Sequence, residues 1–427
     1  MRATLWLVAL FAVAVAAALF AGNNQGTITV FWPPWRLDLS LNLVLLSLAL
    51  LFTTLYAALR GLSALAALPR QAQRWRLQKK ERAMHGALLE ALAQLTSGRF
   101  LRARKSADAA LEQEQSLAAD HASLPQAESV RVLANVIAGD ASHALQDRSA
   151  RNQHLEQALA SVANPAGELS QELREGAQLR AARWALDDQE PEDALERLSA
   201  LPQGAGRRTL ALRIRLKAAR AAQRTQDALE TARLLGKHRA FSPTATQSIV
   251  RGLASEVLRN AHDVEQLNAS WEALEAAERD MPELAILAAK RLAELGGEPT
   301  QVRRWLEPVW TQLIEQPGSL AEVDARRLVR TLETALDTLD ASWLARIETA
   351  QKSNPRDVRL QYLAGVACVQ RQLWGKAQQL LTQAAPRLQD SALRASAWRH
   401  LAQLAEQRDD AEAALQAWKR AAQALAD

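Results

Sequence analysis

Cysteine is nearly absent from this chain of 427 residues, in which Cys368 is the single example. One cysteine excludes an intrachain disulfide framework, a zinc site built from several thiolates and a CxxCH haem attachment, and it agrees with a reducing compartment. Glycine and proline are also sparse, at 17 and 14 residues. Alanine, leucine, glutamine, glutamate and arginine dominate instead. Because these residues are strong helix formers, we expect an all-α protein.

Motifs of catalysis are missing as well. The seven histidines show no HExxH or HxH pattern and no pairing with carboxylates at metal-ligand spacing. No GxGxxG, GxxxxGK(S/T) or GxSxG occurs. The short run Gly204-Ala-Gly206 is better explained as a turn between helices than as an anion-binding nest. The sequence therefore predicts no catalytic residues and no metal, and an enzyme is the weakest of the function classes.

Long uncharged stretches occur near the N-terminus. Ala3–Ala21 and Leu39–Leu59 carry no formal charge, and each is close to the roughly 20 residues that cross a bilayer core as a helix. We expect residues 1–68 to form a two-helix transmembrane hairpin with a short outer loop. The first stretch also fits a cleaved signal peptide, because Arg2 precedes it and it contains small residues.

The predicted outer loop carries aromatic and strand-forming residues. Trp32 and Trp35 flank a pair of prolines, and we expect both indoles to anchor at the level of the lipid headgroups. The preceding Thr27–Val30 has the composition of a strand.

A basic juxtamembrane segment over residues 69–85 follows the second stretch. Six positive side chains lie within 13 positions: Arg70, Arg74, Arg76, Lys79, Lys80 and Arg82. The net charge of the whole chain is only +5, so the high pI belongs to this region. Because positive charge is retained in the cytoplasm, we predict a membrane protein with two spans and a cytoplasmic C-terminal domain.

We expect the same six side chains to contact anionic lipid, at about 1 kcal/mol each. A nucleic-acid surface is disfavoured, because Trp75 is the only aromatic residue among them and stacking platforms need several.

Residues 86–427 show a repeated pattern of small and large side chains at helical spacing. The pattern Ala414-x3-Trp418-x2-Ala421 follows Trp398. The similar pattern Ala377-x3-Leu381-x2-Ala384 begins 37 residues before Ala414. This spacing is typical of tetratricopeptide (TPR) repeats and predicts a TPR-like α-solenoid. Weaker copies begin at Ala194 and Ala228, and the boundaries between 128 and 330 stay undefined. The residues expected to pack between repeat helices are Ala103, Ala110, Ala377, Ala384, Trp398, Ala414, Trp418 and Ala421.

Two residue types have a second interpretation. Trp398 and Trp418 would line a ligand groove if they are not core residues. Cys368, within Gly365-Val-Ala-Cys-Val, is expected to be a buried core thiol; ligation of haem is the alternative, although no proline follows it and no histidine is adjacent.

The order of these features resembles the HemY-type inner-membrane proteins of proteobacteria. The resemblance rests on the apolar stretches, the loop beginning at Gly22–Gly26, the basic segment, the run Ala87–Gly98 that opens a TPR unit, and Asn152–Ala158. It implies a membrane-anchored TPR protein associated with haem (protoporphyrin) biosynthesis and without an established catalytic activity. The flavin-dependent protoporphyrinogen oxidase that shares the name is a different protein, and its dinucleotide fingerprint is absent here.

The resemblance and the residues together suggest a scaffold or adaptor. Its expected partners are membrane lipid and late haem-pathway enzymes held in the TPR groove, with no nucleic acid. No cofactor is indicated by the residues, while binding of haem or a porphyrin stays open. The alternative is a general cell-envelope assembly adaptor of the inner membrane with no haem role.

Overall fold

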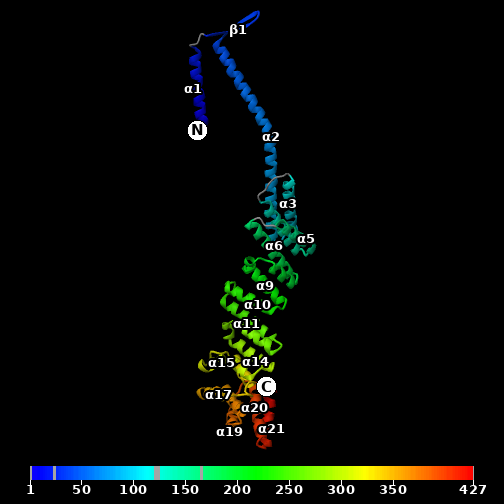
Figure 1. Ribbon diagram of the computed structural model, residues 1–427, viewed down its shortest axis with the longest axis vertical. Helices are drawn as coiled ribbons and strands as arrows, with labels where there is room; N and C mark the ends of the chain where they lie inside the picture. Colours follow the sequence, from blue (N-terminus) through cyan, green and yellow to red (C-terminus); the bar gives the residue numbers. More distant parts are fainter. Residues whose placement is uncertain (1, 23–25, 120–125, 164–166, 427) are drawn as a thin grey trace. The chain divides into compact units, whose positions relative to one another are not determined.

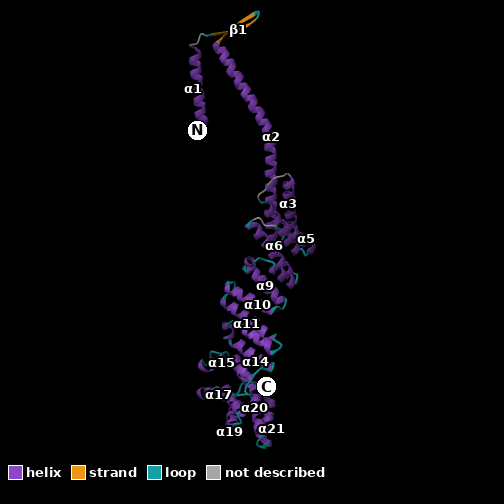
Figure 2. Cartoon of the chain, viewed as in Figure 1, coloured by secondary structure: helices purple, strands orange, loops and turns teal. Residues whose placement is uncertain are grey.

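The computed structural model describes residues 2–22, 26–119, 126–163 and 167–426 (Figure 1). The described part is mostly α-helical, and its strands are confined to one hairpin, drawn in orange in Figure 2. The chain divides into two compact units, Met1–Arg174 and Glu175–Asp427. The predicted single repeat domain over 86–427 is thus divided, and the division falls within one helix, α6 (Glu168–Asp187).

The first unit begins with helix α1 (Arg2–Gly22) and an antiparallel hairpin of β1 (Thr27–Trp32) and β2 (Trp35–Ser40). The two strands pair without a slip from Thr27 opposite Ser40 to Trp32 opposite Trp35. The predicted strand at Thr27–Val30 is confirmed and is longer than expected, while its partner strand β2 was not predicted.

Helix α2 (Leu41–Thr96) starts two residues later than the sequence suggested. Leu39 belongs to β2, where it pairs with Ile28, so the expected helix start at Leu39 is wrong. The Ser40 side chain accepts a hydrogen bond from the Leu43 N–H at 3.3 Å. Serine at this position satisfies one of the free N–H groups at the helix start and sets where α2 begins.

One helical stretch among the described residues, Leu41–Ser63, is long and apolar enough to cross a membrane. Within α1 the apolar stretch Leu10–Leu19 is shorter. The two-span hairpin therefore stays a prediction.

Helix α2 continues without a break from this candidate span into the folded body. Its 56 residues correspond to about 84 Å at the usual rise of an α-helix. The boundaries predicted after residues 68 and 85 both lie inside it. Its C-terminal part packs on α3 (Phe100–Ala119) and α4 (Ala127–Ala144), and α4 packs on α5 (Arg148–Ser161). A helix, rather than a flexible linker, joins the apolar stretch to the helical hairpins.

The second unit is a series of helical hairpins. Its helices are α7 (Pro191–Ser199), α8 (Gln203–Gly206), α9 (Thr209–Ala221), α10 (Thr225–Lys237), α11 (Pro243–Arg259), α12 (Val264–Glu272), α13 (Ala276–Arg279), α14 (Pro282–Glu294), α15 (Pro299–Glu315), α16 (Glu322–Glu333), α17 (Ala341–Ser353), α18 (Val358–Gln370), α19 (Trp374–Ala384), the 3-10 turn η1 (Ala385–Arg387), α20 (Ser391–Glu406) and α21 (Ala411–Ala426). The run Gly204-Ala-Gly206 lies in α8, a single turn between α7 and α9, so the turn interpretation is confirmed.

Packing in this unit occurs at two levels. Consecutive helices such as α14 and α15, or α18 and α19, form hairpins. The first helices of successive hairpins also contact one another in the order α11, α14, α16, α18, α20. Figure 1 shows α9, α10, α11 and α14 following one another in chain order. Contact of each hairpin with the next is the packing of a helical repeat array.

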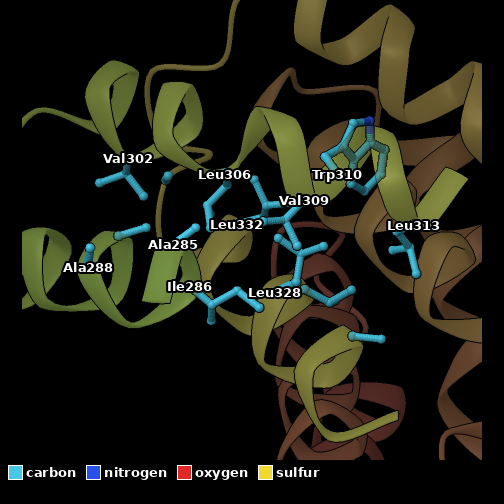
Figure 3. Close-up of a cluster of buried hydrophobic side chains, with 14 of the residues drawn as sticks. Ala285, Ile286, Ala288, Val302, Leu306, Val309, Trp310, Leu313, Leu328 and Leu332 are labelled. Carbon is cyan, nitrogen blue, oxygen red and sulfur yellow. The ribbon is translucent and has the colours of Figure 1, made fainter. Parts of the chain in front are cut away.

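Small residues sit where these helices approach most closely. Ala103, Ala110, Ala377 and Ala384 are fully buried, and so are Ala194 and Ala228 in the weaker copies. At Gly365 of α18, an added Cβ would lie 2.7 Å from Leu381 Cγ of α19. Larger side chains fill the remaining space between hairpins, as Figure 3 shows for the buried cluster of α14, α15 and α16.

The turns inside the hairpins repeat a single backbone motif. Seven of them place a residue in the left-handed region of φ, at Gly98, Gln146, Gln189, Gln223, Gly296, Gln372 and Asp409. In the α18–α19 turn, the Gln372 N–H bonds to Val369 O and the Leu373 N–H bonds to Cys368 O, at 2.9 and 2.8 Å. This is the Schellman motif, which satisfies the last carbonyl groups of a helix.

Candidate partner-binding groove

An apolar groove of about 880 Å³ lies between α14, α15 and α16 in the second unit. We name it the α14–α16 groove. Ile286 and Val302 are buried in its floor, and Leu287, Ala293 and Pro299 are half-buried beside them. Ile286 and Val302 also belong to the hydrophobic cluster of Figure 3. The floor of the groove is therefore part of the packed core. Because core side chains are held in place by their neighbours, the shape of the floor is pre-formed.

The turn between α14 and α15 opens one end of the groove. Gly296 has a φ of +75°, and at Gly297 a Cβ would come within 2.3 Å of Leu292 Cδ1. Glycine adopts the conformation at position 296 without strain, and a larger residue at position 297 would have to displace the Leu292 side chain. Pro299 then starts α15 at a position where its missing N–H costs nothing. The two glycines and the proline are a sequence signal for this turn, but they do not specify the groove beside it.

The rim of the groove is more positive than negative. Four basic side chains line it, from Arg259, Lys290, Arg327 and Arg330, against the two carboxylates of Glu283 and Glu294. Both carboxylates are already paired: Glu283 with Arg251 at 2.9 Å and Glu294 with Lys290 at 3.6 Å. Within the described part of the chain, Arg259 has no carboxylate within salt-bridge distance. The other three cations are paired: Lys290 with Glu294, Arg327 with Asp324 at 3.4 Å, and Arg330 with Asp390. The Arg327 side chain is nevertheless 64% exposed, so Arg259 and Arg327 are accessible to an anionic group of a partner.

Arg330 is held by an ion pair at the rim. It donates to Asp390, the residue before α20, and Arg326 lies 3.5 Å from the same carboxylate. Burial raises the pKa of Asp390, but the Leu393 N–H and the two arginines outweigh it and hold the pKa below its ordinary value. The carboxylate is thus ionised at neutral pH and orients Arg330.

Polar side chains beside the groove hold α16, α18 and α20 together. Ser396 Oγ donates to Glu333 Oε1 at 2.6 Å, and His400 Nε2 lies 3.6 Å from the same oxygen. Burial raises the pKa of Glu333, but His400 and the hydrogen bond from Ser396 leave it below the ordinary value. An ionised carboxylate among these three helices helps to hold them together beside the groove.

The basic residues predicted to contact lipid lie along α2 in different environments. Arg74, Arg76 and Arg82 are exposed. Lys79 is also exposed, with its Nζ 5.5 Å from the centre of the Trp75 ring. Lys80 is half-buried and donates to Ser116 Oγ of α3 at 2.8 Å. The side chain of Arg70 lies outside the described residues. Lys80 is therefore engaged with the protein body.

The tryptophans expected at functional positions differ in exposure. Trp32 and Trp35 face each other across the hairpin and are each 73% exposed. Trp398 is half-buried beneath the guanidinium of Arg420. Trp418 is 38% exposed, and its Nε1 donates to Glu406 Oε1 at 2.8 Å. The core position expected for Trp418 is therefore not observed, whereas Ala414 and Ala421 on the same helix are buried. Neither tryptophan lines the α14–α16 groove.

Cys368 is fully buried in α18. Burial raises the pKa of its thiol, which keeps it protonated and unreactive. Among the described residues no group of three or more His, Cys, Asp or Glu side chains is placed to hold a metal ion.

The chain is similar to a known family in its N-terminal part. Residues 26–131 match the family model described as HemY protein N-terminus. The match runs from the hairpin through α2 and α3 to the start of α4, and it confirms the predicted resemblance to HemY-type proteins. The motif Asn152–Ala158 lies beyond the matched residues. No curated protein matches the chain.

Two solved structures match the chain at low similarity. The structure of Naa15/Naa10 bound to HypK-THB is 13% identical with a TM-score of 0.25; the match covers 81% of this chain and 64% of that one. The P58(IPK) TPR domain is 13% identical with a TM-score of 0.21, and the match covers 76% of this chain and 99% of that one. The repeat array is defined by the contacts between successive hairpins, from α11 to α20.

Proposed function

We propose that this chain, whose N-terminal region is similar to HemY proteins, is a membrane-anchored helical-repeat scaffold. It would bind a partner in the α14–α16 groove. Support for the anchor comes from α2, which carries the apolar stretch Leu41–Ser63 and then packs against α3 and α4. Support for the scaffold comes from the repeated hairpins. The scaffold would act by holding a partner beside the bilayer rather than by catalysis.

The apolar floor and cationic rim of the groove are the observation that carries this proposal. A pre-formed apolar surface with a few placed polar groups is the general form of a binding site. The floor would take an apolar surface, and Arg259 and Arg327 would receive carboxylates that flank it. The proposed partner is therefore amphipathic and acidic.

The membrane and the pathway belong to the same proposal. Retention of the basic residues of α2 in the cytoplasm would place the helical hairpins on the cytoplasmic side of a bacterial inner membrane. Helices α1 and α2 would cross that membrane. The name of the matching family points to haem biosynthesis, so the partners would be late haem-pathway enzymes. A tetrapyrrole has an apolar ring that would fit the floor of the groove and carboxylates that would pair with its cationic rim. Its binding would need no metal ligand.

Photo-cross-linking in native membranes tests the proposal. A photoreactive residue at position 287 reports on the floor of the groove, and one at the exposed position 415 on α21 serves as its control. We expect cross-linked partners from position 287 alone. The double variant Arg259→Glu/Arg327→Glu should abolish them, whereas Arg356→Glu, an exposed arginine outside the groove, should leave them unchanged.

The identity of the captured partner decides the rest. Late haem-pathway enzymes, or displacement of the cross-link by added porphyrin, would support the pathway. Capture of envelope-assembly proteins only would favour the general adaptor. Unchanged porphyrin and haem levels after deletion of the gene would contradict the haem role, and equal capture from positions 287 and 415 would contradict the groove.

A further inference from the structure

The β1–β2 hairpin has two chemically different faces. Residues opposite each other in an antiparallel pair lie on the same face, and the face alternates along each strand. The observed register therefore places three apolar pairs on one face: Ile28 with Leu39, Val30 with Leu37, and Trp32 with Trp35. We call these six residues the apolar hairpin face.

The opposite face satisfies its own polar groups. It carries the pairs Thr27 with Ser40, Thr29 with Asp38, and Phe31 with Arg36. Thr29 Oγ1 donates to Asp38 Oδ1 at 2.6 Å, and Arg36 lies 3.6 Å from the same carboxylate and 5.4 Å from the centre of the Phe31 ring. Its one positive and one negative charge cancel. Phe31 on this face is 72% exposed beside the Arg36 guanidinium, and the other five residues are polar or charged. This face is therefore the more polar of the two.

Four of the six residues of the apolar hairpin face are exposed in the folded chain, and Ile28 and Leu39 are half-buried. Val30 and Leu37 are 44% and 56% exposed, and the tryptophan pair at the tip is more exposed still. A two-stranded hairpin is at best marginally stable in water when nothing covers it. A contiguous exposed apolar patch marks an interaction surface.

The connection to α2 says what covers this face. Strand β2 ends at Ser40 and α2 begins at Leu41, the first residue of the candidate membrane span. The Leu41 N–H also bonds to Gly26 O at 2.8 Å and closes the base of the hairpin onto the helix. The hairpin therefore has no linker that would let it leave the end of the span, where hydrocarbon meets headgroups and tryptophan is enriched.

We propose that the apolar hairpin face lies in the lipid headgroup–acyl boundary of the bilayer that α2 crosses. The partner is the lipid surface itself, and the hairpin acts as an interfacial anchor at the outer end of α2. This inference rests on the membrane anchoring in the proposed function. It accounts for both tryptophans on one face and for the absence of net charge.

Adjacent positions on opposite faces provide a matched test. Val30 lies on the apolar hairpin face and Thr29 on the other, so the full chain is prepared as Val30→Cys and as Thr29→Cys. Cys368 is fully buried and will not compete for a nitroxide label. Each labelled protein is reconstituted in vesicles of phosphatidylcholine and phosphatidylglycerol. Collision rates of the label are measured with oxygen, which partitions into lipid, and with a water-soluble nickel chelate.

The expected result is a higher ratio of oxygen to nickel collisions at position 30 than at position 29. Equal, water-like ratios in protein that floats with the vesicles would overturn the inference and leave the anchoring intact. Spin–spin broadening at position 30 that disappears on dilution with unlabelled chain would show a second copy on this face, and so would also overturn it. Failure of the unlabelled chain to float would remove the membrane anchoring itself. Unchanged thermal unfolding of both variants confirms that the labels do not disturb the fold.

Discussion

At the scale of single residues, Arg303 shows how one side chain holds a turn. It lies in α15, is only 1% exposed, and donates to Ala335 O and to Thr338 O, the latter at 3.1 Å. Both carbonyl groups belong to the connection between α16 and α17. A guanidinium can serve two carbonyls at once because its donors form a rigid fork.

We expect Arg303→Met to lower the free energy of unfolding by about 1–3 kcal/mol, because it leaves buried carbonyl groups without a donor. The neighbouring exposed residue provides the control: Arg304→Met should change it by less than about 0.5 kcal/mol. Urea unfolding of the two variants measures the difference. Similar values for both would contradict the role given to Arg303.

Glycine has two opposite effects in these helices. Gly365 faces Leu381 Cγ and Cδ2, which an added Cβ would approach to 2.7 and 2.8 Å, whereas Gly252 in α11 has open space around it. We expect Gly365→Ala to destabilise by about 1–3 kcal/mol through overpacking. Gly252→Ala should stabilise by up to about 1 kcal/mol, because alanine is the better helix former. The same sign for both in thermal unfolding would mean that α18 and α19 can move apart.

At the scale of elements, the turns define the repeats more clearly than the helices do. Gln146, Gln189, Gln223 and Gln372 all adopt positive φ in Schellman motifs. That conformation costs a non-glycine residue about 1 kcal/mol or more, so glutamine is not expected there. The turns at these glutamines therefore cannot be recognised from the sequence. Only Gly98 and Gly296 mark their turns in the sequence. This is why the repeat boundaries between 128 and 330 could not be predicted.

The α4–α5 hairpin contains a half-buried histidine. His154 Nδ1 lies 3.0 Å from Asn135 Oδ1 of α4, and its Nε2 lies 3.9 Å from Asp108 of α3. Burial lowers the pKa of His154 below 6.5; Asp108 opposes this shift and Arg104 adds to it. The folded chain therefore holds the imidazole neutral at a pH where the unfolded chain has begun to protonate it.

This shift has a direction that can be tested. Stability from the neutral imidazole is fully present above the unfolded pKa of 6.5 and is lost as the pH falls below it, because the unfolded chain binds the proton first. We expect the urea midpoint, followed by proteolysis within α5, to decrease between about pH 8 and about pH 5. His154→Gln should flatten that decrease, whereas replacement of the exposed His238 by Gln should not. Equal slopes in the two variants would contradict the assignment.

At the scale of the whole molecule, α2 combines two roles that the sequence suggested separately. The apolar stretch and the basic residues are parts of one helix that ends among α3 and α4. At about 1.5 Å per residue, Arg74, Arg76 and Arg82 fall within about 12 Å of one another along the axis. They form a band of positive charge between the candidate span and the helical hairpins.

A topology assay tests this arrangement. A reporter that is active only in the cytoplasm should work when fused after Asp427 and fail when inserted near Asn24, a position outside the described residues. Replacing Arg74, Arg76 and Arg82 by glutamine should reduce reporter activity or release the body from anionic vesicles, because about 3 kcal/mol of surface attraction is lost. The matched change Lys80→Gln should have a smaller effect on topology, since Lys80 is bound to Ser116. A periplasmic C-terminus would contradict the compartment.

The sequence by itself determined the local features of this protein. Helical composition, the apolar stretch of α2 and the small residues at Ala377, Ala384, Ala414 and Ala421 each depend on neighbours within one or two turns. Such signals survive in a single sequence because helix propensity and burial periodicity are set residue by residue along the chain.

Only the tertiary structure decided the features that join distant residues. The pairing that turns Trp35–Ser40 into a strand, the bond between Lys80 and Ser116, the surface position of Trp418 and the α14–α16 groove all arise from elements that meet after folding. The groove combines an α11 arginine with side chains from α14, α15 and α16. No spacing along the sequence specifies which of these faces meet, because that choice depends on how whole helices pack.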